Sequence, residues 1–236
     1  MNTVQIRRFA TRAELDAALA ARLEQAITAA AASGGGAIML SGGHTPLPAY
    51  RQLAARLRHS GAALHGKLHI LFSDDRYVPA DSEASNYHAS RPLLDALALP
   101  AAQVLRVRTE LPLEQAALDY EQRLRALLEQ GATVTLGMLG LGADGHTASL
   151  FRSADLARAR GHLALAVSRP DGLSGVSVTP EFIARIPEPL FVIAGTGKEA
   201  AIAGLERGDP GVIAVQAVQA CPRCAVWVEQ AAEQGA

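Results

Sequence analysis

Short apolar runs alternate with longer amphipathic segments along nearly the whole chain, and this alternation restricts the folds open to it. The runs "AIML" (37–40), "KLHILFS" (67–73), "TVTLGML" (133–139) and "LFVIA" (190–194) are short and continuous, as in strands buried on both faces of a parallel sheet. Segments with helical character separate them. Strands and helices that alternate in this way predict an α/β protein with an open, mostly parallel, Rossmann-like sheet and helices on both faces.

Capping residues and helix breakers place the individual elements. Thr11 and Glu14 form a capping box that begins a long helix, and "SGGG" (Ser33–Gly36) ends it. Further helices are predicted over 46–58, 86–98, 112–130 and 197–206, with short ones after His146 and from Pro180, and further strands over 104–107, 163–167, 176–179, 212–215 and 225–228. Because no repeat or linker interrupts this pattern, we expect a single domain over residues 1–236.

Composition argues against several classes of function. The formal net charge is −1 and no Lys/Arg face is clustered, which disfavours nucleic-acid binding. No stretch approaches the roughly 20 apolar residues of a membrane span, and the N-terminus lacks a signal-peptide pattern, so we expect a soluble, cytoplasmic protein. Cys221 and Cys224 have neither a second pair for zinc nor a thioredoxin-like context, and are predicted to be structural thiols.

In an open α/β sheet, ligands bind beyond the carboxyl ends of the strands, so the loops after strands are where function is sought. The first such loop is "LSGGHTP" (40–46), in which Thr45 is predicted to be the N-cap and Pro46 the first helical residue. Its glycines then precede a helix N-terminus, where free N–H groups and the helix dipole favour an anion. A well-capped turn without a ligand is an equal alternative.

Two further loops offer cations for the same anion. "FSDDRYVP" (72–79) places Asp75 and Arg76 at a strand end, where Arg76 either pairs with a neighbouring carboxylate or presents its planar fork to a phosphate. "AGTGKEAA" (194–201) places Lys198 in the first turn of a helix, where the dipole disfavours a cation unless an anion is bound. A solvated lysine is the alternative.

The loop "LGLGADGHTASLF" (139–151) carries the best candidate for chemistry. Its glycines satisfy G-x-G-x-x-G between a strand and a helix, but no acidic ribose ligand follows roughly 20 residues later, which disfavours dinucleotide binding. Histidine is a titratable residue type whose reference pKa is about 6.5, and His146 follows glycines that bring backbone close to a ligand. A lone histidine is more often structural, but Asp144 and Thr147 beside it favour a catalytic role.

The motifs "LSGGHTP", "DDRYVP" followed by "SNYHASR", "LGLGADGHTASLF" and "GTGK" resemble, in order and spacing, those of the 6-phosphogluconolactonase family over nearly the whole chain. The most specific element is D-G-H-T-A-S-L-F. The related glucosamine-6-phosphate deaminases share Asp-Gly-His but typically continue with a Phe-Asn-Glu-Pro run that supplies a catalytic carboxylate. Here Ser149, Leu150 and Phe151 follow instead, which favours the lactonase.

The resemblance implies hydrolysis of 6-phospho-D-glucono-1,5-lactone to 6-phospho-D-gluconate, the second step of the oxidative pentose phosphate pathway, with no metal and no cofactor. It implies that His146 acts as general acid and base, with Asp144 orienting it. The residues expected to bind the substrate and its phosphate are Ser41, Gly42, Gly43, Thr45, Asp75, Arg76 and Lys198. We expect a monomer or weak homodimer. A deaminase or isomerase, and a sugar-phosphate-binding protein without catalysis, remain the alternatives.

The chain departs from the family's usual pattern at four positions. His44 stands where serine is usual, Asp75 where glutamate is usual, and Arg152 where proline commonly follows. Gly175 stands where the family tends to have an arginine. Arg169 is the nearest candidate to supply the missing positive charge.

Overall fold

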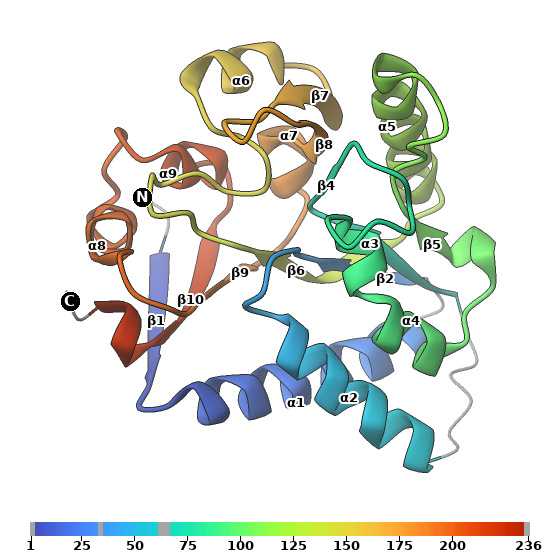
Figure 1. The fold of residues 1–236 in the computed structure, drawn as a ribbon, viewed down its shortest axis with the longest axis horizontal. Coiled ribbons are helices and arrows are strands. Elements are labelled where there is room, and N and C mark those ends of the chain that lie inside the picture. Colours follow the sequence, from blue (N-terminus) through green and yellow to red (C-terminus); the bar gives the residue numbers. More distant parts are fainter. Residues whose placement is uncertain (1–2, 33–34, 61–66, 234–236) are drawn as a thin grey trace.

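A computed structural model describes residues 3–32, 35–60 and 67–233, and within them the main sheet has seven strands (Figure 1). The sheet order is β1-β10-β9-β6-β2-β3-β5, and every neighbouring pair is parallel. The bounds of these strands are β1 (Thr3–Phe9), β2 (Gly36–Leu40), β3 (Leu68–Phe72), β5 (Val104–Leu105), β6 (Thr133–Leu139), β9 (Pro189–Ile193) and β10 (Arg223–Glu229). The predicted fold class is confirmed.

Helices cover both faces of this sheet. One face carries α1 (Arg12–Ala32), α2 (Leu47–Ser60) and α4 (Arg91–Leu97), and the other carries α5 (Leu113–Glu129), α7 (Pro180–Ile183), α8 (Glu199–Arg207) and α9 (Ile213–Ala217) (Figure 1). Two short helices, α3 (Asn86–Ala89) and α6 (Ser153–Arg158), lie in connections. None of the described helices combines the length and the apolar character needed to cross a bilayer.

The alternation of side chains along β2 explains why buried strands appear in the sequence as unbroken apolar runs. Ile38 and Leu40 belong to the hydrophobic cluster beneath α1 and α2, whereas Ala37 and Met39 belong to the cluster beneath α5. Successive side chains of a strand point to opposite faces, and here both faces are covered. All four side chains are fully buried.

A second, antiparallel sheet of three strands packs on the α5 side and was not predicted as a separate unit. Its order is β4-β8-β7, with β4 (Asp74–Arg76), β7 (Ala164–Ser168) and β8 (Ser174–Val178). The apolar runs of β7 and β8 were predicted as strands. β4 was predicted as a loop, because three charged residues carry no apolar periodicity.

Several predicted boundaries need correction. The segment 212–215, predicted as a strand, lies in α9, since a short apolar run does not distinguish a strand from a buried helix by periodicity. The helix predicted over 86–98 is two helices separated at Ser90. β1 was missed, and α2 begins at Leu47 rather than at Pro46.

Of the capping box predicted at the start of α1, the bond to the Thr11 hydroxyl is confirmed, whereas the reciprocal bond of the Glu14 carboxylate goes to the residue before Thr11. The N–H of Glu14 donates to Thr11 Oγ1 (3.2 Å), and the Glu14 carboxylate accepts from the N–H of Ala10 (3.1 Å). Of the predicted stop at Ser33–Gly36, Ser33 and Gly34 lie outside the described residues.

Candidate active site

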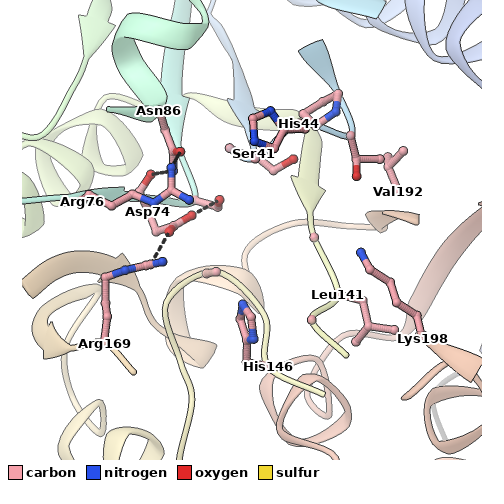
Figure 2. A pocket seen from close by; sticks show the side chains of 18 residues that line it. Ser41, His44, Asp74, Arg76, Asn86, Leu141, His146, Arg169, Val192 and Lys198 are labelled. Atoms are coloured by element: carbon pink, nitrogen blue, oxygen red, sulfur yellow. Dashed lines mark hydrogen bonds and ion pairs between the residues drawn. The ribbon is translucent and has the colours of Figure 1, made fainter. Parts of the chain in front are cut away.

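Four loops meet at the carboxyl edge of the main sheet, where the strand order reverses between β2 and β6. They follow β2, β3, β6 and β9, which are neighbours in the sheet, and this reversal is the place where open α/β sheets bind ligands. The loops line a cavity of about 320 Å³ (Figure 2). Among the residues predicted for the site, those that line the cavity are Ser41, Gly42, Gly43, Thr45, Arg76, His146 and Lys198.

The loop after β2 presents backbone donors at this cavity. Within the described residues, the N–H groups of the segment 42–45 donate to no protein acceptor, and α2 begins two residues later. The loop also packs closely on Asn86, because a Cβ placed on Gly42 would lie 2.0 Å from the Asn86 side chain. Only glycine fits there. Free amides before a helix of this length are suited to an anion.

The side chains of β4 alternate, and this alternation separates Asp74 and Arg76 from Asp75. Asp74 and Arg76 line the cavity, but Asp75, predicted to bind substrate, faces the other way and is buried. Its carboxylate accepts hydrogen bonds from the N–H groups of Asn86 (2.6 Å) and Tyr87 (3.1 Å), at the start of α3. The structure therefore places Asp75 as a support for α3 and does not bring it to the cavity.

Replacing Asp75 by asparagine is expected to change how stability depends on pH. Burial raises the pKa of Asp75 from 3.8 to about 6, although its hydrogen bonds to backbone N–H groups act in the opposite direction. A raised pKa means that this group's contribution to stability is present below pH 3.8 and is lost as pH rises to about 6. The loss is about 1.4 kcal/mol for each pH unit in that interval.

Urea unfolding of wild type and Asp75→Asn at intervals from pH 4 to 7 measures this slope. Asparagine cannot ionise, so its stability curve lacks the Asp75 slope. Parallel curves for the two proteins would contradict the assignment.

Asp74, which the sequence analysis did not select, is the centre of a buried polar network. Its carboxylate accepts from Ser73 Oγ (2.9 Å) and Ser149 Oγ (2.7 Å), and Arg169 Nη1 lies 3.7 Å from it. A strand assignment for 74–76 would have placed Asp74 on the same side as Arg76, but three charged residues carry no strand pattern. Because each charge in this network has a partner, its burial costs only a moderate desolvation free energy.

Arg169 brings a positive charge to the cavity from the end of β7. Its guanidinium donates to Ser149 Oγ (2.6 Å) and forms an ion pair with Asp171 (3.0 Å). A Cβ on Gly175 would lie 3.3 Å from Arg169 Cδ and 3.0 Å from the carbonyl oxygen of Asp75. Gly175 therefore leaves the space that Arg169 uses, and Arg169 remains the candidate for the missing family arginine.

His146 and Asp144 form the pair expected for acid and base chemistry. His146 Nδ1 lies 2.5 Å from Asp144 Oδ1, and this contact assigns the proton of the neutral ring to Nδ1, which leaves Nε2 as the basic nitrogen. Burial raises the pKa of Asp144, but the hydrogen bonds from His146 outweigh it and the pKa is lowered overall. The Asp144 carboxylate itself does not line the cavity.

An aromatic ring separates His146 from Arg169. The rings of His146 and Phe151 have centroids 4.4 Å apart, and the Arg169 guanidinium lies 5.3 Å from the Phe151 centroid. The turn before His146 also needs a glycine, because Gly145 has φ +81°. In the view of Figure 2 the imidazole lies between Arg169 and Lys198.

Alanine at Gly142 is expected to displace the imidazole, while alanine at Gly140 is not. A Cβ on Gly142 would lie 2.1 Å from His146 Nδ1 and 2.5 Å from Asp144 Oδ1, whereas a Cβ on Gly140 meets nothing within 4 Å. If His146 is catalytic, Gly142→Ala lowers kcat by about 10²-fold or more, and Gly140→Ala has a far smaller effect. Steady-state assays of both variants test this, and equal effects would exclude the steric explanation.

Two cations of the cavity lack an acidic partner. Within the described residues, Arg76 donates to Asn86 Oδ1 (2.8 Å) and to the carbonyl oxygen of Ala84 (3.0 Å), and neither Arg76 nor Lys198 forms an ion pair with a carboxylate. Burial lowers the pKa of Lys198, and the positive charge of Arg12 lowers it further. Across the described residues, no group of three or more His, Cys, Asp and Glu side chains is placed to hold a metal ion. The cavity is therefore suited to a small anion.

The fold and the cavity define a Rossmann-like α/β protein with a cation-lined site and a histidine–aspartate pair at the carboxyl ends of its strands. Residues 10–227 match the sequence profile described as glucosamine-6-phosphate isomerases/6-phosphogluconolactonase, and the chain belongs to this family.

Individual relatives agree with this assignment. The chain is 35% identical to the 6-phosphogluconolactonase of Homo sapiens over 203 residues, which cover 82% of this chain and 78% of that protein. It is 39% identical to the 6-phosphogluconolactonase of Thermotoga maritima over 115 residues, about half of each chain (48% and 49%). The crystal structure of the Thermotoga maritima 6-phosphogluconolactonase superposes with a TM-score of 0.82, covering 96% of this chain and all of that one at 24% identity.

Proposed function

We propose that this protein hydrolyses 6-phospho-D-glucono-1,5-lactone to 6-phospho-D-gluconate, the second step of the oxidative pentose phosphate pathway. The observation that carries the proposal is that His146, paired with Asp144, lines one cavity with Lys198, Arg76 and the free amides after β2. The histidine–aspartate pair suits acyl transfer to water, and the two cations with the free amides suit a phosphate. The family and the names of the relatives supply the reaction.

In the proposed mechanism, His146 acts first as a base and then as an acid. Nε2 takes a proton from water while the water oxygen forms a bond to the lactone carbonyl carbon, and the π electron pair of the C=O bond moves onto the carbonyl oxygen until the next step re-forms that bond. The bond from that carbon to the ring oxygen then breaks, and the imidazolium returns the proton to the ring oxygen. The product is a carboxylic acid that ionises at neutral pH. Asp144 stabilises the imidazolium formed between the two steps.

The phosphate, remote from the reacting carbon, is assigned to the Lys198 ammonium, the amides of the loop 41–45 and Arg76. A phosphate held there orients the lactone, so that binding energy from an unreactive group contributes to the rate. Arg76 is itself fixed by Asn86, which limits the orientations of its guanidinium. This assignment predicts a strong preference for the phosphorylated lactone.

An assay with freshly generated 6-phosphogluconolactone tests the reaction. The product is detected by its coupled oxidation, and the rate is compared with spontaneous hydrolysis and with hydrolysis of phosphate-free gluconolactone. Acceleration confined to the phosphorylated lactone is the expected result. A folded protein that gives no acceleration would refute the proposal, and ammonia release from glucosamine 6-phosphate would support a deaminase instead.

We further propose that the chain acts in the cytoplasm as a single domain over residues 1–236, and as a monomer or weak homodimer. Sedimentation across a concentration series measures the oligomeric state. A tight oligomer at the lowest concentration would contradict it.

A further inference from the structure

Arg12, the first residue of α1, contacts the loop 41–45 although it does not line the cavity. Its Nη2 donates to the carbonyl oxygen of Thr45 (2.7 Å) and lies 3.5 Å from that of His44. Its Nε donates to Asp16 Oδ1 (2.8 Å), one turn further along the helix. Asp16 is buried, so it fixes the direction of the guanidinium.

Tyr50 holds the other end of the same loop. Its buried hydroxyl donates to the carbonyl oxygen of Ser41 (2.9 Å). In a planar trans peptide the C=O and the following N–H point in opposite directions. A Ser41 carbonyl turned to Tyr50 therefore directs the N–H of Gly42 the other way, and a His44 carbonyl turned to Arg12 does the same for the N–H of Thr45.

These amides are the donors left free at the cavity. Within the described part of the chain, neither Gly42 N–H nor Thr45 N–H has a protein acceptor. Both residues line the cavity, and Ser41 and His44 lie at its upper side in Figure 2. Carbonyls bound to Tyr50 and Arg12 cannot turn toward the cavity, where they would repel an anion.

The charge of Arg12 also reaches the site. Burial lowers the pKa of Lys198, and the positive charge of Arg12 lowers it further, so the charge of Arg12 acts on this lysine of the cavity. Asp16 is the acidic partner of Arg12, and no carboxylate forms an ion pair with Lys198 in the described residues. Lys198 therefore brings to the cavity a positive charge that no carboxylate pairs with in the described residues.

We propose that Arg12, oriented by Asp16, is a positioning residue for the substrate's phosphate: it holds the loop 41–45 so that its amides face the anion. The inference rests on the proposed function, because it assigns the phosphate to this loop. Arg12 acts through the loop and touches no reacting atom.

Steady-state kinetics of Arg12→Gln and Asp16→Asn test the proposal, with Arg22→Gln on the same helix as the matched control. Arg12→Gln is expected to raise KM for the phosphorylated lactone roughly ten-fold, the loss of one charge-assisted hydrogen bond, and to change kcat by less than about two-fold. Hydrolysis of phosphate-free gluconolactone stays unchanged. Asp16→Asn keeps Arg12 but removes the carboxylate that orients it, and is expected to raise KM by a smaller factor than Arg12→Gln.

Calorimetric titration with 6-phosphogluconate measures the same contact without catalysis. A weaker affinity in Arg12→Gln, with wild-type affinity in Arg22→Gln, is expected. An unchanged KM and affinity in Arg12→Gln overturns the proposal, and so does an equal loss with both lactones, which indicates a general structural defect. A wild type that binds 6-phosphogluconate without hydrolysing the lactone refutes the proposed function alone, and the titration still decides the role of Arg12.

Discussion

Replacing His146 by alanine is expected to lower kcat for 6-phosphogluconolactone by about 10²- to 10⁴-fold, the usual contribution of a positioned general acid and base. The imidazole lines the cavity, and its Nδ1 is bound to Asp144, so Nε2 is the nitrogen available to a water molecule. The cations and amides assigned to the phosphate are untouched in this variant. Binding of 6-phosphogluconate is therefore expected to stay within a few-fold of wild type.

Asp144→Asn measures the contribution of the aspartate separately from that of the histidine. The carboxamide keeps the shape of Asp144 but loses the negative charge that stabilises the imidazolium, and kcat is expected to fall less than in His146→Ala. A His146→Ala variant with wild-type kcat would show that the histidine takes no part in the chemistry.

Replacing Lys198 by methionine is expected to lower kcat/KM for the phosphorylated lactone by about 10- to 100-fold, mainly through KM. The ammonium lies half-buried in the cavity without an ion-pair partner among the described residues, and a charge-assisted hydrogen bond to a phosphate contributes about 1.5 to 3 kcal/mol. Methionine keeps the length and apolar contacts of the side chain. The phosphate-free lactone, which has no partner for the ammonium, is expected to react equally with both proteins.

The pH dependence of KM gives a second readout for Lys198. Burial and the charge of Arg12 lower its pKa, so the ammonium loses its proton at a lower pH than an ordinary lysine. The wild-type KM is then expected to rise at alkaline pH, and that rise is absent in Lys198→Met. Lys67, the chain's other lysine, is exposed at the start of β3, and Lys67→Met is the matched control. Equal effects of the two substitutions would contradict the assignment of the phosphate.

The fold class followed from the sequence because buried parallel strands carry an unmistakable apolar run, as the side chains of β2 show on both faces. Elements with weaker sequence patterns could not be predicted in this way. The run around Ile213 suits a helix and a strand equally, and only its packing beside α8 decides for the helix. β4 consists of three charged residues whose pairing with β8 supplies the hydrogen bonds that make it a strand.

The candidate site was predictable as a set of loops and less so as a set of side chains. Parallel strands that end at one edge bring Ser41, Arg76, His146 and Lys198 together whatever the details of the loops. The direction of a side chain depends on local backbone geometry, and this is why Asp75 was selected and Asp74 was not. Arg12 carried no signal at all, since it acts through carbonyl oxygens that every residue possesses.

The close approach of Gly175 to Arg169 limits how the arginine of this cavity can be relocated. Any side chain at 175 presses on Arg169 Cδ and on the backbone of β4. A side chain at 175 therefore begins directly beside the one at 169, and its neighbours have to shift by a few tenths of an ångström to admit it. Moving the charge to β8 by engineering therefore calls for both substitutions together, since an arginine added at 175 crowds Arg169, and removing Arg169 alone leaves the buried Asp74 without its ion-pair partner.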